Sequence, residues 1–258
     1  TFSGRYMANR GLLGSGEYRF LGETTNGGYS GIARGEFIPD DSKFGSSRYG
    51  WSYEHNQNIY YWDTDLFLNT DIGYVSDTAY LDDLSDNLQV SSASHIPQIV
   101  NLSIDPFDIF VEDENLQINA DISAYQTLDS SVSSDDEPYT RLPGVKATWN
   151  KTYELNLDDS GGYLRDDSTR FSLRPEFDSE VVNFDHSVAN KTKGQRLDLQ
   201  PAIALPMERT YGSVTPKLTY AYTAYNVHDQ PDNKPSSPTR GIYLFEIGSE
   251  LFLEREVG

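Results

Sequence analysis

The sequence predicts an all-β protein: an antiparallel transmembrane β-barrel, of which this chain supplies a fragment of about twelve strands. Three observations predict this fold. Polar and apolar residues alternate over long stretches, short and long joints follow one another, and eighteen Tyr, twelve Phe and three Trp accompany twenty Gly. Aromatic and β-branched residues suit pleated strands, whereas Gly, Asn and Asp suit the turns between them.

The clearest alternation spans residues 62–74, where even positions are mostly apolar and odd positions mostly polar. The even positions are Trp62, Thr64, Leu66, Leu68, Thr70, Ile72 and Tyr74, and the odd ones are Asp63, Asp65, Phe67, Asn69, Asp71 and Gly73. Because successive side chains point to opposite faces, such a strand has one apolar and one polar face. At about 3.3 Å per residue it is roughly 40 Å long, which is long for a globular sheet.

The same alternation recurs in residues 116–124, 170–177, 197–205, 217–223 and 243–254. We expect the apolar sides of these strands to face lipid and the polar sides to face a wet lumen. The expected lipid-facing residues are Trp62, Leu66, Leu68, Ile72, Leu218, Tyr220 and Tyr222. The expected lumen-facing residues are Asp63, Asp65, Asn69, Asp71, Asn119, Asp121, Lys217 and Thr219. A register slip of one residue would exchange the two faces.

The joints between these strands alternate in length. Short turns are predicted near residues 22–28, 57–61, 105–115 and 206–212, long polar loops near residues 76–94, 129–141, 185–195 and 228–240, and an intermediate joint near 158–169. Short turns on one side and long loops on the other are typical of an outer-membrane barrel, whose long loops lie outside the cell. Pro175, Pro201 and Pro216 are expected mostly at strand ends, because proline lacks a donor for the ladder, and a bulge or a local weakening of the ladder is the alternative.

Composition excludes several classes of protein. The net charge of −20 disfavours a nucleic acid partner, and the absence of cysteine excludes disulfides and cysteine metal sites. No apolar run is long enough for a transmembrane helix, but barrel strands carry their apolar residues in alternation and need none. No signal peptide opens the chain, and Thr1 is expected to lie inside a longer protein.

No motif of catalysis or metal binding stands out. The acidic clusters do not fit a calcium loop and are interpreted as solvated loop tips, which leaves weak divalent binding in the long loops open. The four histidines form no zinc-binding spacing, and among forty carboxylates no motif isolates a catalytic pair. We therefore expect no catalytic, cofactor-binding or metal-binding residues, and no enzyme.

A soluble β-sandwich also alternates, with its apolar face turned inward. Its strands are usually about five or six residues long, whereas the alternating stretches here are longer. The length of the strands, their polar second face and the many aromatic residues favour the barrel. A secreted, glycan-binding sandwich remains the alternative from another class, and extraction distinguishes them, because a barrel needs detergent.

Six segments, in order along the chain, resemble motifs of the LptD family. They are residues 5–11 (Arg-Tyr-Met-Ala-Asn-Arg-Gly) with 16–21; residues 51–56; Val75-Ser76-Asp77 with Tyr80, Asp83 and Leu84; residues 138–143 (Pro-Tyr-Thr-Arg-Leu-Pro); residues 201–206 with 211–212 and 216–218; and residues 252–255. The segment from Val75 to Leu84 is the most diagnostic of the six. Because the segments run from Arg5 to Arg255, the resemblance covers nearly the whole chain.

This resemblance implies a fold and a role. Residues 1–258 would be part of an outer-membrane barrel domain of the twenty-six-strand type, without its N-terminal jellyroll and its remaining strands. The implied function is non-catalytic: a translocon of the Gram-negative outer membrane that inserts lipopolysaccharide (LPS) into the outer leaflet. Another large barrel, such as a porin or receptor, is the alternative within the membrane class, but it would lack the Val75–Leu84 segment and the hairpin of residues 201–218.

The resemblance also implies partners. They are LPS itself, outer-membrane lipid, an LptE-type lipoprotein that plugs the barrel, the periplasmic Lpt bridge reached through the missing jellyroll, and the β-barrel assembly machinery during folding. It implies no cofactor and no nucleic acid.

Overall fold

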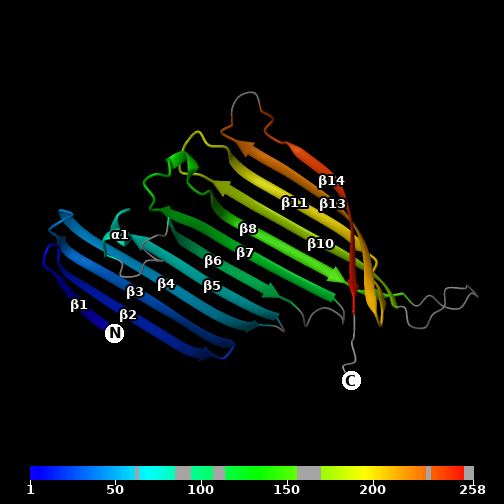
Figure 1. Cartoon of the computed structure of the whole chain (residues 1–258), viewed down its shortest axis with the longest axis horizontal. Coiled ribbons are helices and arrows are strands. Elements are labelled where there is room, and N and C mark those ends of the chain that lie inside the picture. Colours follow the sequence, from blue (N-terminus) through cyan, green and yellow to red (C-terminus); the bar gives the residue numbers. More distant parts are fainter. Residues whose placement is uncertain (62–63, 85–93, 107–113, 156–169, 231–233, 253–258) are drawn as a thin grey trace, which may run out of the picture.

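The computed structural model describes residues 1–61, 64–84, 94–106, 114–155, 170–230 and 234–252. They form one antiparallel sheet of fourteen strands (Figure 1). The strands are β1 (Phe2–Met7), β2 (Gly11–Thr24), β3 (Gly27–Asp41), β4 (Ser46–Tyr61), β5 (Thr64–Val75), β6 (His95–Asp105), β7 (Glu114–Thr127), β8 (Thr140–Lys151), β9 (Tyr153–Glu154), β10 (Arg170–Asp185), β11 (Lys193–Ala204), β12 (Met207–Arg209), β13 (Gly212–His228) and β14 (Thr239–Leu251). The predicted all-β, antiparallel class is confirmed, and twelve of the strands are longer than the short β9 and β12.

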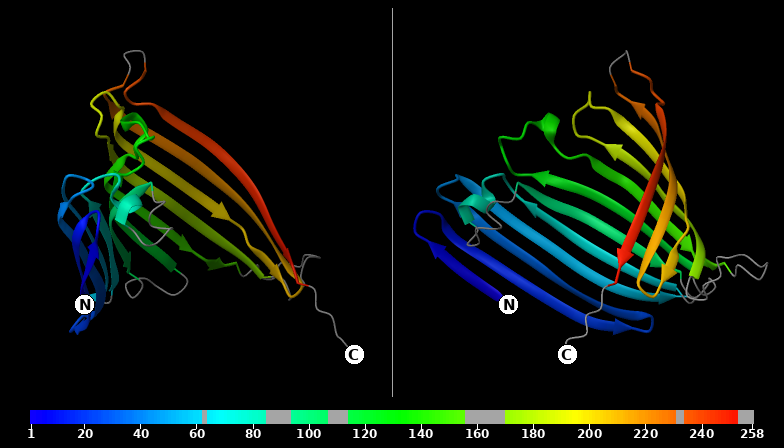
Figure 2. Two further views of the ribbon diagram at one scale, coloured as in Figure 1. Left: turned by 60° about the vertical axis from the view of Figure 1, so that its left-hand side comes forward. Right: turned by 45° about the vertical axis from the view of Figure 1, so that its right-hand side comes forward.

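Strands adjacent in the chain are also neighbours in the sheet, apart from the short β9 and β12. Every pairing is antiparallel. This simple order follows from the sequence, because antiparallel neighbours need no long crossover. The sheet bends into a trough whose two edges are β1 and β14 (Figure 2). Among the described residues no second sheet covers it, so they do not form a two-sheet sandwich.

The connections separate into two ends of the sheet. The described parts of the connections that follow β5, β7, β10 and β13 leave from one end, which we call the long-loop end, and the helix α1 (Tyr80–Leu84) lies there. Residues 25–26 and 205–211 turn at the opposite end, which we call the short-turn end. The predicted long joints therefore share one end of the sheet, but the short turns of residues 8–10 and 42–45 lie at that end too. The turn predicted near residues 57–61 is wrong, because these residues belong to β4. The predicted intermediate joint, residues 158–169, lies outside the described residues.

The three prolines do not lie at strand ends, as we expected, but inside β10, β11 and β13. The sheet accommodates them with local gaps in its pairing. Between β11 and β13 the register runs from the Leu199–Tyr222 pair directly to the Ala202–Thr219 pair, so Pro201 is not paired with a residue of β13. Proline is tolerated in a long strand where its missing N–H faces such an interruption.

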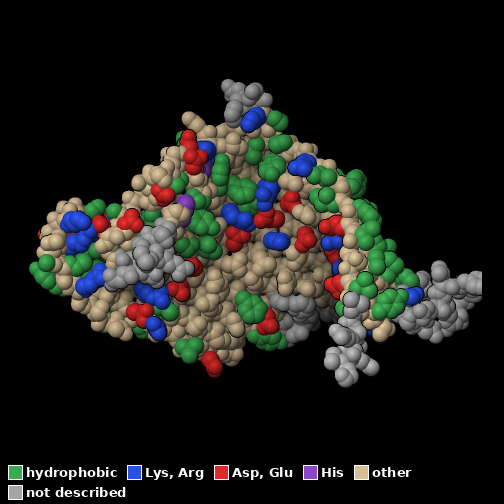
Figure 3. Space-filling view, in the orientation of Figure 1, with side chains coloured by type: hydrophobic (Ala, Val, Ile, Leu, Met, Phe, Trp, Pro, Cys, Tyr) green, Lys and Arg blue, Asp and Glu red, His purple; other side chains and the backbone are tan. Residues whose placement is uncertain are grey.

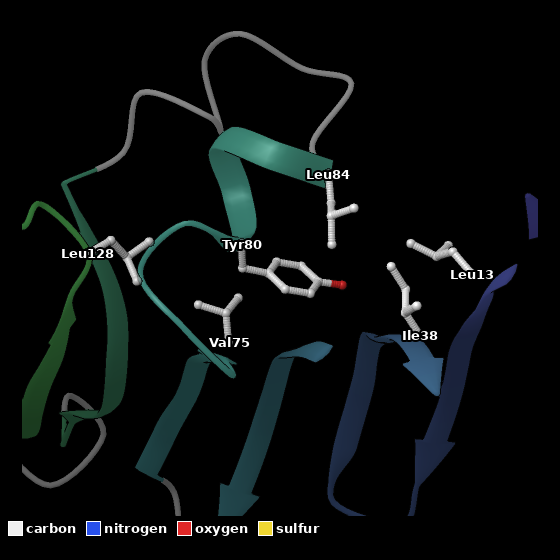
Figure 4. Packing of buried hydrophobic residues seen from close by; sticks show 6 residues of the cluster. All are labelled: Leu13, Ile38, Val75, Tyr80, Leu84 and Leu128. Carbon is white, nitrogen blue, oxygen red and sulfur yellow. The ribbon is translucent and has the colours of Figure 1, made fainter. Parts of the chain in front are cut away.

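The main hydrophobic cluster lies at the long-loop end instead of the middle of the sheet. Val75 and the α1 residues Tyr80 and Leu84 pack against Leu13 and Ile38, as Figure 4 shows. All five are at most 4 % exposed. The cluster fixes the segment after β5 against the ends of β2 and β3. Among the described residues, no helix is long and apolar enough to cross a membrane.

Close packing on the sheet depends on glycine at selected positions. Gly31 of β3 pairs with Phe20 of β2, whose ring lies across it. A Cβ added at Gly31 would overlap the Phe20 ring and lie 2.5 Å from the Glu54 carbonyl oxygen. The absent side chain therefore makes room for a neighbouring aromatic ring, a device that strengthens glycine-containing strands.

Replacement of Gly31 by Ala is expected to destabilise the folded protein by about 1–3 kcal/mol, because the ring and the backbone cannot both move away. The measurement is the midpoint of heat unfolding of the full-length protein in detergent. Gly35→Ala is the matched control on the same strand and face, since nothing lies within 4 Å of its added Cβ. Equal midpoints for both variants would contradict the packing argument.

Candidate functional site

The pairing register divides the sheet into two faces, since directly paired residues project to the same side. We call the face that carries Arg48 the charged face. On β4 and β5 it includes the pairs Glu54–Asp71 and Asn56–Asn69. We call the opposite face the aromatic face, which includes the pairs Trp51–Tyr74 and Tyr53–Ile72.

The residues selected from the sequence separate between these two faces. The charged face carries Asp65, Asn69, Asp71, Asn119, Asp121, Lys217 and Thr219. The aromatic face carries Leu66, Leu68, Ile72, Leu218, Tyr220 and Tyr222. Asp63 and Trp62 lie outside the described residues. The described members of the two predicted sets therefore lie on opposite faces of the sheet.

The aromatic face is apolar along almost its whole length. In the described strands its charged side chains lie near strand ends, as do Glu114 and Lys151, which pair with each other at 3.1 Å. Large side chains on this face are well exposed, including Tyr18 at 68 %, Phe245 at 67 % and Tyr243 at 74 %. An apolar surface of this extent is unusual on a monomeric soluble protein and indicates contact with another apolar phase.

Aromatic rings on this face stack along and across strands. The Phe20 ring lies 5.8 Å from Tyr18 on its own strand, and 6.2 Å from Tyr53 and 5.7 Å from the His55 imidazole of β4, measured between ring centroids. Tyr220 lies 4.8 Å from Tyr243 on the next strand. Such cross-strand aromatic pairs stabilise a sheet and fix its register.

The charged face holds a group of ion pairs over the middle strands, visible as mixed acidic and basic side chains in Figure 3. Arg141 of β8 bridges Asp121 of β7 at 3.0 Å and Glu180 of β10 at 2.7 Å. Arg196 of β11 also pairs with Glu180. On β10 and β13, Lys217 pairs with Glu176. The first three contacts link neighbouring strands through side chains as well as through the backbone, and the Lys217–Glu176 pair reaches across β11, which lies between β10 and β13.

A second group of charged residues, the Arg48 cluster, lies at the long-loop end of the sheet. It connects the strands there to the segment that contains α1. It consists of Arg10, Asp41, Arg48, Asp77 and Asp83. The Arg48 guanidinium is fully buried and donates two hydrogen bonds to Asp77, of 2.9 and 2.7 Å. It also pairs with Asp83 at 2.9 Å and with Asp41 at 3.2 Å. Arg10 completes the cluster at 2.8 Å from Asp41 and 2.6 Å from Asp83.

The electrostatics of this cluster favour charged carboxylates. Burial alone raises the pKa of Asp77, but the hydrogen bonds from Arg48 outweigh it and hold that pKa below its usual value. Asp83 behaves in the same way, with Arg10 and Arg48 as its partners. Burial raises the pKa of Tyr80, and the negative charge of Glu36, whose carboxylate accepts the phenol hydrogen bond, raises it further.

The sequence did not reveal this cluster, although it marked the Val75–Leu84 segment as diagnostic. The geometry explains why these residue types occur there. Asp77 and Asp83 bind the guanidinium of Arg48, Tyr80 lies 5.4 Å from it, and Leu84 packs on the ends of β2 and β3. Sequence reasoning missed the cluster because Arg48, which binds Asp77 and Asp83, lies 29 and 35 residues earlier in the chain, on β4. Among the described residues, no group of three His, Asp or Glu side chains is placed to hold a metal ion.

Replacement of Arg48 by Ala is expected to lower the stability of the full-length protein by about 3–5 kcal/mol, because it leaves buried carboxylates without their main cation. Heat unfolding in detergent measures the loss. Arg34→Ala is the control on the neighbouring strand and the same face. Arg34 is 41 % exposed and pairs with Glu17 and Glu54, so less than about 1 kcal/mol is expected there. A loss at Arg48 no larger than at Arg34 would contradict the role of the cluster.

Comparison with known proteins agrees with this two-faced wall. The relatives include proteins named LPS-assembly protein LptD from Aromatoleum aromaticum, at 32 % identity over 99 % of this chain, and from Azoarcus sp. strain BH72, at 31 % over 99 %. A third, from Nitrosococcus oceani, is 29 % identical over the whole chain. The chain spans 28 %, 28 % and 31 % of the length of these three curated relatives. A family model described as LptD, LPS transport system D, matches residues 46–257, and this chain therefore belongs to the LptD family.

Proposed function

We propose that this chain is part of the wall of an outer-membrane translocon that inserts LPS into the outer leaflet. One observation carries the proposal: the two faces of a single curved sheet differ in polarity. The aromatic face is apolar, whereas the charged face is polar. Its relatives are named LPS-assembly proteins, and the chain belongs to their family. The family match favours this role over that of a porin or receptor.

The aromatic face is proposed to contact lipid. Apart from β1 and the two short strands, the strands are 11 to 17 residues long, and a tilted strand of about 9–11 residues crosses a bilayer. Hydrocarbon offers no hydrogen bonds to the backbone, so a spanning sheet needs paired strands throughout. Residues 1–258 are accordingly proposed as part of a closed barrel whose other strands continue from β1 and β14.

The charged face is proposed to line a wet lumen, with the long loops outside the cell and the short turns in the periplasm. The saccharide and phosphate groups of LPS would cross this lumen while the acyl chains leave sideways into the bilayer. Carboxylates such as Asp65 and Asp71 repel phosphate and thereby prevent the cargo from binding too tightly. This transport makes and breaks no covalent bond.

The membership in the LptD family supports LPS as the cargo. The further proposed partners are an LptE-type lipoprotein plug inside the barrel, the periplasmic Lpt bridge that delivers LPS to the jellyroll, and the β-barrel assembly machinery during folding. Gram-negative outer membrane is the proposed location.

Adjacent residues of β5 test the membrane orientation. Leu68→Arg places a charge on the aromatic face and is expected to destabilise the membrane-embedded protein by about 2–4 kcal/mol. Asn69→Arg, one residue further on the charged face, is expected to be tolerated. The measurement is the folded fraction of the full-length protein in outer membranes. If Asn69→Arg is the more damaging change, the assignment of the two faces is wrong.

The transport role is tested by charge reversal on the lumen wall. Asp65→Lys combined with Asp71→Lys is expected to slow the arrival of newly made LPS at the cell surface, because the added cations hold its phosphates. Pulse-labelling of LPS in cells with equal amounts of folded protein measures the rate. Asp65→Asn with Asp71→Asn is the control, since it removes charge without adding cations. Unchanged export in the Lys variant would refute the acidic-lumen idea.

A further inference from the structure

Phe67 is an exposed aromatic ring on the charged face, where the alternation places mostly polar residues. The described strands carry further aromatic residues on this face, which are Tyr60, Tyr125, Phe184 and Tyr225. Phe67 of β5 is directly paired with Asn58 of β4 and Ser103 of β6. Asp65 and Asn69 flank it on its own strand and project to the same side. Its side chain is 43 % exposed and is not part of the buried hydrophobic cluster. Packing inside the sheet therefore does not account for an apolar ring at this position.

The surroundings of Phe67 are rich in uncharged hydrogen-bonding groups. Asn69 donates to Asn56 at 2.7 Å, and the Ser103 hydroxyl donates to Asn119 at 2.6 Å. A carboxamide has two donors and an acceptor with two lone pairs, so one such contact leaves capacity for a ligand. At the described positions that pair with or flank Phe67 there is no Lys or Arg. This part of the face differs from the middle strands, where Arg141, Arg196 and Lys217 hold the carboxylates in ion pairs.

An exposed ring among amides and hydroxyls matches the chemistry of a pyranose. The C–H groups on one side of a sugar ring pack on the face of an aromatic ring, and its hydroxyls exchange hydrogen bonds with amide and hydroxyl side chains. A protein partner is favoured less, since protein interfaces need a contiguous apolar core, whereas the residues that pair with or flank Phe67 are all polar.

The position of Phe67 along β5 shows which end of the sheet it lies near. It lies near Thr64, where β5 begins at the short-turn end, whereas α1 follows the other end of β5. In the orientation proposed above, the short-turn end faces the periplasm, from which LPS arrives. Cargo entering the lumen would therefore meet Phe67 before it reaches the Arg48 cluster.

We propose that Phe67, with Asn58, Asn69 and Ser103, forms a saccharide-contacting platform on the lumen wall near its periplasmic entrance. The ligand is the sugar portion of LPS, and the inference rests on the proposed function. Phe67 supplies the stacking surface, and the surrounding amides and hydroxyl bind sugar hydroxyls as the cargo passes. The platform is a transient contact, because no cation is present there to hold the phosphates.

The experiment uses the full-length protein with its natural partners, carrying a photo-crosslinking phenylalanine analogue at position 67. The probes are LPS with its complete sugar portion and LPS truncated to its acylated base. The expected result is that complete LPS crosslinks about 2- to 10-fold more than the truncated form, the ratio that an aromatic contact of this strength produces. Equal crosslinking of the two forms, or adducts only to a partner protein, would overturn the platform.

Variants at position 67 provide the second measurement. Phe67→Leu keeps the apolar volume but removes the aromatic face, so export of complete LPS should slow about 2- to 10-fold while Phe67→Tyr exports normally. Leu244→Ala is the control, because Leu244 lies on the same face of β14 at a similar exposure of 45 %. If Phe67→Leu exports like the control, the platform is wrong. If the analogue captures no LPS at position 67 and none at 69 or 121 either, the proposed function itself fails.

Discussion

The continuous antiparallel hydrogen-bond ladder is the constraint on which the rest of this structure depends. Apart from the short β9, each described strand from β2 to β13 has neighbours on both sides, so the backbone of a single-layer sheet is paired without a second sheet or covering helices. Because a pleated strand turns alternate side chains to opposite sides, the ladder also fixes which residues share a face. The chemical contrast between the two faces follows from this geometry, and the membrane role proposed here depends on that contrast.

Side chains reinforce the ladder differently on the two faces. On the aromatic face, rings such as Phe20 pack over glycines of the next strand, where low polarity and close contact favour stacking. On the charged face, Arg141 and Glu180 link strands through ion pairs that are partly solvated. At the long-loop end, Arg48 is removed from solvent altogether and needs three carboxylates to remain buried at acceptable cost. The strongest electrostatic contacts therefore lie where a loop, and not a strand, has to be held.

The same division organises the functional proposals. The Arg48 cluster holds the segment after β5 against the long-loop end of the sheet, whereas Phe67 lies near the start of that strand among polar partners. One end of β5 is thus a fixed structural joint and the other presents groups that remain available to a ligand. A conduit needs both properties, since its wall must stay rigid while its cargo binds only weakly.

The sequence alone determined the fold class, the alternation of short and long joints, and the partition of residues such as Leu68 and Asn69 between opposite faces, because a period of two is a local property of the chain. It also marked the Val75–Leu84 segment as diagnostic without showing its role. The position of Pro175, Pro201 and Pro216 inside strands was decided by neighbouring strands that interrupt their pairing locally. Only the tertiary structure brought Arg48 to Asp77 and Asp83, and set Phe67 between Asn58 and Ser103, because register between strands joins residues whose separation along the chain carries no periodic signal.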